Sequence, residues 1–360
     1  MANTLNDAAL NLSPLNAKAV ADFLVQAIIQ RPDYARYLTI VQGVTMKQQV
    51  IYTTPIDSGV AAGGCDFPTS GAEIVLKDFF YEPKPFGDTF KQCPADLDAL
   101  FQARQTQVRS FMDKYDWDGS DWAAFLTMMM LESANGAFNR FLWLGDSAAA
   151  ASGAATSGLI NAAKIPLFSA VEGIWKDIFA KVTAGTVNRY TITENAAITK
   201  VLQETLAADR GVAILNELIE VAPIPLRNAT DAVFLVSGKI YRNIKATLQK
   251  NSIYTTMDWT VNGVPVMAWD GYGIVNMETV WDKNLKTYFE KDSTNHLWYL
   301  PNRVVMLVPS AVHAPLLNAD DIMTVKTNQV VTDTKELFIL RYGSTLQGLV
   351  VDVNGIAVAY

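Results

Sequence analysis

The sequence is poor in the residues on which most metal sites and many catalytic sites depend. Its 360 residues include two cysteines and two histidines, His296 and His313. Two cysteines are too few for a disulfide scaffold or a multi-cysteine zinc site, and two histidines leave little material for histidine-based metal or acid–base chemistry. Charge is scarce as well, because charged side chains make up 18% of the chain, below the ~25% of an ordinary soluble domain.

Neither a long hydrophobic run nor an excess of basic residues is present. A membrane span needs about 20 apolar residues in a row. The uncharged stretch 147–163 is mainly alanine, serine and glycine, and the stretch 304–319 is broken by Pro309 and Pro315. We therefore expect no membrane span, and the N-terminal residues show no secretory signal pattern. With 29 basic and 36 acidic side chains the net charge is −7, which argues against nucleic-acid binding through a basic surface.

Apolar residues, by contrast, are abundant. They make up 50% of the chain, which is too much for a disordered protein. A monomer of this size has room to cover its surface with charge. The combination of low charge and high apolar content therefore indicates that other subunits cover part of the surface.

An extended hairpin is predicted near the N-terminus. Residues 47–54 and 72–81 are rich in β-branched and aromatic types, and proline and glycine are frequent between them. An isolated two-stranded hairpin is marginal in water, so we expect it to lie on its own body or on a neighbouring subunit. Its candidate subunit-interface residues are Val50, Tyr52, Phe79, Phe80 and Tyr81.

The rest of the chain alternates between helical and extended patterns. Apolar periodicity predicts helices at 13–30, 96–115, 118–144, 172–184, 194–208, 238–250 and 279–290. Strands are predicted at 231–237, 264–269, 303–308, 323–332, 335–343 and 348–360. The small-residue segment 145–158 between these groups is predicted to be a loop.

The order of these elements resembles that of the tailed-bacteriophage major capsid protein, the Hong Kong ninety-seven fold. An N-terminal helix, a long glycine-rich hairpin and two helices lead to the loop FLWLGDSAAA. Residues 231–250 (DAVFLVSGKIYRNIKATLQK) and 264–309 look like parts of the family's axial domain. The final strands, from 324 to 360, look like those that close its peripheral domain.

The resemblance implies an α+β fold with four regions. Residues 1–46 would form an N-terminal arm, 47–95 an extended loop, 96–150 with 320–360 a peripheral domain around a long spine helix, and 151–319 an axial domain. The sequence starts at Met1, so we expect that no N-terminal scaffolding segment is removed and that any scaffolding protein is separate.

The function implied by the resemblance is structural. The chain would be made in the host cytoplasm and self-assemble, as hexamers and pentamers, into the icosahedral shell of the virion. It would contact the packaged double-stranded DNA non-specifically, with portal, scaffolding and decoration proteins as possible partners. No enzymatic activity, metal or cofactor is implied. Two alternatives stay open, an encapsulin-like compartment shell and a cytosolic α/β enzyme.

Four aspartates near the end of the predicted spine helix invite comparison with a calcium loop: Asp113, Asp116, Asp118 and Asp121. The required register would place Lys114 at the first ligand position and Phe125 at the last, so the motif fails and a capped helix–helix turn is expected. A turn is also expected at 271–273, where Gly-Tyr-Gly lacks the third glycine of a dinucleotide fingerprint.

The remaining candidate chemistry is equally weak. Ser310 lies near the two histidines in the sequence, but no G-x-S-x-G elbow is present. We expect Trp122, Trp175 and Trp281 to pack in the core, because they lie on the apolar stripes of helices. Cys65 and Cys93 are expected to be free thiols, with a bridge between them as the alternative.

Overall fold

The computed structural model describes residues 37–44, 47–53, 76–92, 136–149, 154–155, 158–250, 259–261, 264–292, 294–316, 326–332 and 335–360. The predictions for the helices at 13–30 and 96–115, the four aspartates, Trp122, Cys65 and Cys93 lie outside these residues.

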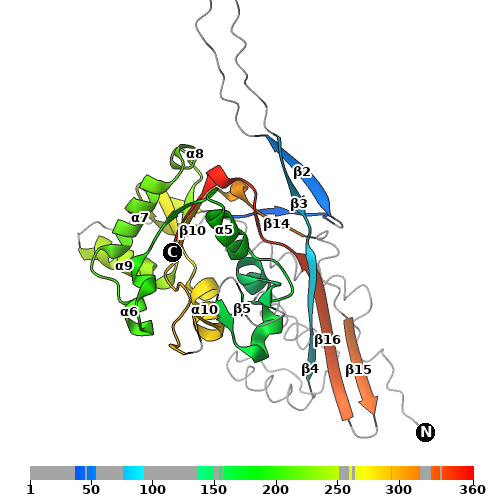
Figure 1. Ribbon diagram of the computed structural model, residues 1–360. Helices are drawn as coiled ribbons and strands as arrows, with labels where there is room; N and C mark the ends of the chain where they lie inside the picture. Colours follow the sequence, from blue (N-terminus) through cyan, green and yellow to red (C-terminus); the bar gives the residue numbers. More distant parts are fainter. Residues whose placement is uncertain are drawn as a thin grey trace, which may run out of the picture.

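A mixed seven-stranded sheet forms the centre of the body (Figure 1). Its strands, in spatial order, are β7 (Asn188–Tyr190), β18 (Ile356–Ala359), β13 (Val304–Leu307), β8 (Val233–Val236), β11 (Tyr272–Asn276), β10 (Val264–Trp269) and β9 (Trp259–Val261). Strands β18, β13 and β8 are buried at every position. Their unbroken apolar sequences are typical of strands covered on both faces.

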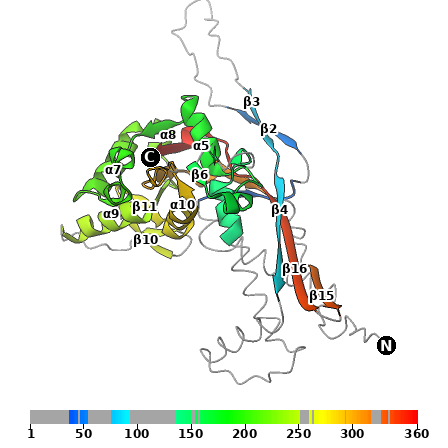
Figure 2. The ribbon, with the colours of Figure 1, turned by 60° about the horizontal axis from the view of Figure 1, so that its bottom comes forward.

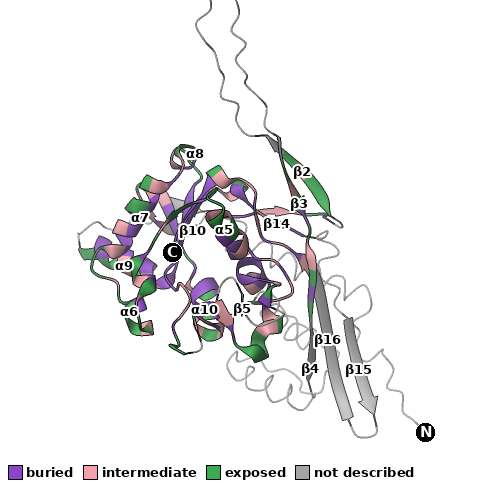
Figure 3. Ribbon diagram, viewed as in Figure 1, coloured by how far each residue is buried: buried purple, intermediate pink, exposed green. Residues whose placement is uncertain are grey.

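Helices cover both faces of this sheet, and in Figure 3 buried residues are frequent in its strands and in the helices beside it. Alternate residues of β8 belong to two different hydrophobic clusters, because successive side chains of a strand point to opposite faces. Phe234 and Val236 pack with α7 (Arg210–Val221) and α9 (Gly238–Lys250). Val233 and Leu235 pack with α5 (Ile174–Thr183), the helical residues 136–144, and α10 (Lys283–Tyr288).

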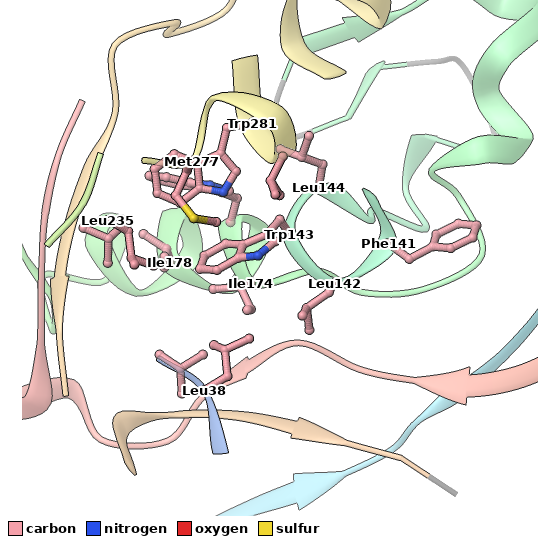
Figure 4. Packing of buried hydrophobic residues seen from close by; sticks show 14 of the residues in the cluster. Leu38, Phe141, Leu142, Trp143, Leu144, Ile174, Ile178, Leu235, Met277 and Trp281 are labelled. Atoms are coloured by element: carbon pink, nitrogen blue, oxygen red, sulfur yellow. The ribbon is translucent and has the colours of Figure 1, made fainter. Parts of the chain in front are cut away.

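Three tryptophans pack together in the second cluster, and Figure 4 shows two of them, Trp143 and Trp281, beside each other. Trp281, in the π-helical turn Glu278–Asp282, makes edge-to-face contacts with Trp143 at 5.2 Å and with Trp175 at 5.3 Å between ring centroids. All three side chains are fully buried. The prediction that Trp175 and Trp281 pack in the core is therefore confirmed.

Long strands extend along one side of the body (Figures 1 and 2). The predicted hairpin forms from β2 (Gln48–Thr53) and β3 (Leu76–Tyr81). The chain then continues into β4 (Lys84–Gln92), which pairs with β16 (Lys335–Leu346) and through it with β15 (Lys326–Thr332). In both views the hairpin and the β4–β16–β15 sheet run in opposite directions from the place where they join the body.

Two small sheets complete the described structure. The first contains β1 (Thr39–Val41), β14 (Val312–Pro315) and β17 (Leu349–Val350), and it lies where the hairpin leaves the body. The second contains β12 (Phe289–Glu290), β6 (Gly158–Ile160) and β5 (Ala154–Ala155).

The helix predicted at 194–208 is wrong as one continuous helix. A 3-10 turn at Thr193–Ala196 is followed by α6 (Lys200–Glu204). The backbone is extended at Ala197 and Thr199, and the Thr199 side chain accepts a hydrogen bond from the backbone N–H of Leu202 at 3.2 Å. This N-cap starts a new helix and separates it from the turn before it.

Helix α7 and the short helix α8 (Ile224–Arg227) were missed by the sequence analysis. The residues of α7 themselves carry the helical signal that was missed, because Val212, Leu215 and Leu218 recur at helical spacing and are buried. A Cβ at Gly211 would lie 2.8 Å from Ile244 of α9, so glycine is what lets the two helices approach. The backbone N–H of Gly211 also donates to Asn243 of α9 at 2.7 Å.

The last strand crosses the predicted domain boundary. Residues 320–360 and 151–319 were assigned to different domains, whereas β18 pairs with β13 and β7 in the central sheet. The four residues of β18 are apolar and buried on both faces, which a central position satisfies and an edge position does not. The remainder of the domain division stays a prediction.

Candidate subunit interface

The register of the β2–β3 hairpin divides the five candidate residues between its two faces. Val50 pairs with Phe79 and Gln48 pairs with Tyr81, whereas Phe80 pairs with Gln49. Because side chains alternate along a strand, four of the candidates occupy register positions on one face: Val50, Tyr52, Phe79 and Tyr81. Phe80 occupies the opposite face, and the side chain of Tyr52 lies outside the described part of the chain.

The face that carries Tyr81 lies on the chain's own body. Tyr81 is buried, and its hydroxyl lies 2.6 Å from Nδ1 of His313 in β14. The Phe79 ring makes edge-to-face contacts with Tyr81 at 5.3 Å and with His313 at 6.4 Å. We expected the hairpin to lie either on its own body or on a neighbouring subunit. The end of the hairpin that contains Phe79 and Tyr81 lies on its own body.

Hydrogen bonding determines which ring nitrogen of His313 carries the proton. Nε2 lies 3.1 Å from the carbonyl oxygen of Ser310, which can only accept, so Nε2 is the donor. Nδ1 then accepts from the Tyr81 hydroxyl. Burial lowers the pKa of His313 and raises the pKa of Tyr81, so both side chains are held neutral.

This geometry does not form a nucleophilic site. Ser310 presents its carbonyl oxygen to His313, and His296 pairs instead with Glu290, with 3.0 Å between Nδ1 and Oε2. The turn expected at 271–273 lies at Asp270 and Gly271, which have positive φ and join β10 to β11, whereas Tyr272 and Gly273 already belong to β11.

The opposite face of the hairpin is exposed and partly apolar, and Figure 3 shows that most of β2 is exposed. Ile51 is 63% exposed and Phe80 is 42% exposed. Nζ of Lys47 lies 4.7 Å from the centroid of the Phe80 ring, and Gln49 donates to Asp78 at 2.9 Å beside them. The sequence analysis named Phe80 and missed Ile51, although strand alternation was the signal that separates Ile51 from the buried face.

Both ends of the hairpin are anchored. Before it, β1 runs parallel to β14, with Thr39 opposite His313. After it, β4 pairs with β16 from Lys84 opposite Leu346 to Gln92 opposite Phe338. Two anchored ends fix the direction in which the hairpin leaves the body.

A charge network that the sequence did not reveal ties β4 to α5. Nζ of Lys84 lies 3.2 Å from Glu172, and Nζ of Lys176 lies 2.6 Å from Glu172 and 2.8 Å from Asp146. Ser147 also donates to Glu172. Burial would raise the pKa of Glu172, but hydrogen bonds from Lys176 and Ser147 lower it, so the carboxylate stays charged.

Within the described ranges, no group of three or more histidine, cysteine, aspartate or glutamate side chains is placed to hold a metal ion. Among the described helices, none is long and apolar enough to cross a membrane.

No protein-family model matches the sequence, and no curated protein matches it. Among solved structures, it is similar to a chain of the satellite phage P4 procapsid including the size determination (Sid) protein, with a TM-score of 0.50, 12% identity, and coverage of 94% of this chain and 97% of that chain. The capsid of the native GTA particle gives a TM-score of 0.46 at 12% identity, covering 92% and 90% of the two chains. The holo-SrpI encapsulin complex from Synechococcus elongatus PCC 7942 gives a TM-score of 0.44 at 10% identity, covering 92% of this chain and 87% of that chain.

Together with the order of its elements, the match to the P4 procapsid identifies the architecture: the chain has the α+β fold of tailed-phage major capsid proteins, the Hong Kong ninety-seven fold.

Proposed function

We propose that this chain is a shell-forming major capsid protein of a tailed bacteriophage. Copies of it would self-assemble, as hexamers and pentamers, into the icosahedral shell that encloses the viral genome. The observation that carries the proposal is the likeness of fold to a phage procapsid chain over 94% of this chain.

The hairpin supports an assembly function on physical grounds. One of its faces is held by Tyr81 and His313 of its own body, while the other presents Ile51 and Phe80 to solvent. Covering the exposed apolar side chains of a projecting two-stranded ribbon with a neighbouring surface lowers the free energy, because apolar area is removed from water. Each such contact is weak, but a closed shell repeats it many times, and linked contacts reinforce one another.

Contact with the packaged DNA would be non-specific. The net charge of −7 offers no general attraction to phosphate, so DNA binding would depend on local basic groups and weaken with salt. Portal, scaffolding and decoration proteins are partners that the proposal allows.

The proposal is tested by removing the exposed apolar side chains of the hairpin. Because Ile51 and Phe80 lie on the solvent face, the double variant Ile51→Ser, Phe80→Ser should fold like the parent chain. Its yield of closed particles, measured by sedimentation velocity and negative-stain microscopy, should fall about 10-fold or more, because the shell repeats the weakened contact many times.

The matched control is the double variant Gln49→Ser, Asp78→Ser, which removes polar side chains from the same face. It should assemble at close to the parent yield. A parent chain that stays monomeric at all concentrations would contradict the shell function. Particles that contain a defined protein cargo in place of nucleic acid would contradict the phage assignment and favour the compartment shell.

A further inference from the structure

The turn that leads into β18 contains an asparagine followed by a glycine, Asn354 and Gly355. It is the 3-10 turn Val353–Gly355, between β17 and β18. The side chain of Asn354 is exposed. Among the described residues its backbone N–H makes a hydrogen bond and its carboxamide makes none. The carboxamide is therefore free to change its rotamer and to approach the backbone that follows it.

The backbone nitrogen of Gly355 comes next in the chain and is poorly protected. Glycine has no Cβ, so no side chain of its own shields this nitrogen from the Asn354 carboxamide. The N–H of Gly355 donates to the carbonyl oxygen of Asp352 at 3.3 Å, which is longer than the usual N–H···O range of about 2.7–3.2 Å. A bond of this length restrains the nitrogen weakly.

The side chain of Asp352 restrains the turn more strongly. Its carboxylate accepts a hydrogen bond from the backbone N–H of Asn354 at 2.9 Å. This cap holds the backbone of Asn354 in the turn, and the backbone has to rotate before the Gly355 nitrogen can reach Cγ of Asn354. Asp352 therefore controls how often the two atoms meet.

We propose that Asn354 is a site of spontaneous deamidation. The backbone nitrogen of Gly355 attacks Cγ of Asn354 and forms a new C–N bond, while the bond from Cγ to the side-chain nitrogen breaks. Ammonia leaves with the proton from the Gly355 N–H, and a five-membered succinimide remains. One water molecule then opens the ring to aspartate or isoaspartate. Water is the only co-reactant, and the inference does not rest on the proposed shell function.

Deamidation changes both the charge of the turn and the entry into β18. Aspartate at position 354 takes the net charge from −7 to one unit more negative, and isoaspartate also lengthens the main chain. The neighbouring Gly355 is closely packed, because a Cβ on it would lie 2.7 Å from Cβ of Ala311, and its carbonyl oxygen accepts from Val308 at 3.0 Å. Since β18 is buried throughout, a longer turn should loosen its first residues.

Peptide mapping of the full-length folded chain tests the proposal. The purified chain is incubated at pH 8.5, where the attacking nitrogen loses its proton more readily than at neutral pH, and samples are digested at intervals. In liquid chromatography with mass spectrometry, the peptide that contains Asn354 should gain about 1 Da and separate into two isomeric products. The Asn354→Gln variant should show no such change over the same period.

Asn228 is the matched control within the same chain. Its side chain is exposed, and its backbone N–H donates to the carbonyl oxygen of Ile224 at 3.1 Å, as in a turn. The residue after it is Ala229, whose Cβ shields the backbone nitrogen. Asn228 should therefore deamidate at least about 10-fold more slowly than Asn354. Equal rates at the two asparagines overturn the proposal.

Two further samples separate the turn from the dipeptide. Chain unfolded in urea gives the rate without any turn, and conversion of Asn354 in that sample but not in the folded chain overturns the proposal. In the folded Asp352→Ala variant, loss of the cap should raise the rate about 3-fold or more, with circular dichroism as the check on folding. An unchanged rate in this variant overturns the restraint by Asp352.

Discussion

Two basic side chains, Arg303 and His313, make contacts that join segments of the body far apart in the sequence. Arg303 is fully buried, its guanidinium lies 4.5 Å from the Trp175 ring centroid, and its Nε donates to the carbonyl oxygen of Leu300 at 2.9 Å. Burial lowers the pKa of Arg303 to about 9, so the group stays charged at neutral pH. Leu300 has a φ of 47°, and the bond from Arg303 holds its carbonyl in that unfavourable conformation.

His313 should make the stability of the hairpin joint depend on pH. Burial lowers the pKa of His313 below its ordinary value of 6.5, so between those two values the unfolded chain binds more protons. The free energy of unfolding should therefore decrease as the pH falls below about 6.5. Thermal unfolding of the parent chain and of His313→Gln between pH 7 and pH 5 checks this, and the variant should show the smaller loss.

A second buried group changes stability in the opposite direction over part of this range. Burial raises the pKa of Asp282 to about 6 from 3.8, so between these values the folded chain binds more protons than the unfolded chain. The contribution of Asp282 to the free energy of unfolding therefore falls as the pH rises from 3.8 to 6. Asp282 is present in both the parent chain and His313→Gln, so the difference between their pH profiles reports on His313.

Tyr81→Phe is the companion variant, because it leaves Nδ1 of His313 without a hydrogen-bond donor. It should lower the free energy of unfolding by about 1 kcal/mol at pH 7. Equal pH dependence in the parent and His313→Gln would exclude a contribution from this histidine.

Close contact between elements determines how the long strands join the body. Residue 348 lies between β16 and β17, and its backbone N–H donates to the carbonyl oxygen of Glu172 at 2.8 Å, just before α5. The charge network of Lys84, Glu172 and Lys176 lies beside this bond. The joint therefore depends on backbone approach as well as on ion pairs.

Gly348→Ala should destabilise the joint. A Cβ at this position would lie 2.6 Å from the backbone N of Ile174 and 2.7 Å from the carbonyl oxygen of Leu142, and backbone atoms cannot move aside cheaply. We expect the free energy of unfolding to fall by about 1–3 kcal/mol in denaturant titrations.

Gly136→Ala is the matched control. Nothing lies within 4 Å of its added Cβ and the residue is helical, so stability should stay the same or rise by up to about 1 kcal/mol. Equal losses in the two variants would contradict the packing argument.

At the scale of the whole molecule, the exposed large apolar side chains of the described residues gather in three places: the outer face of the hairpin (Ile51 and Phe80), the start of α6 (Ile198, Val201 and Leu202) and the start of α8 (Ile224). Covering surfaces that lie apart takes several contacts, which the proposed shell would supply from copies of the same chain.

Assembly should therefore raise the thermal stability of the chain. Copies that bind only the folded state shift the unfolding equilibrium by mass action. Differential scanning calorimetry of closed particles should show a higher Tm than that of the dissociated chain in the same buffer, by about 1–2 °C for each ~1 kcal/mol of contact energy per copy. The same Tm for both forms would mean that the contacts contribute no stability to the subunit.

The sequence by itself determined the elements with strong local patterns. The strands β8, β10 and β13, the helices α5 and α9 and the hairpin β2–β3 form where periodicity and composition predict them, because apolar spacing reports which face of an element is buried. Low charge and high apolar content predict, from composition alone, a surface that other subunits cover. The order of the elements was enough to predict the fold.

Only the tertiary structure decided how those elements share their surfaces. It separated Tyr81, buried against His313, from Phe80 and Ile51, which face solvent. It placed β18 between β7 and β13 in the main sheet, broke the helix predicted at 194–208, and left Ile198, Val201 and Leu202 exposed. The physical reason is that burial depends on contacts between residues far apart in the chain, and local spacing contains no information about which distant segment completes a contact.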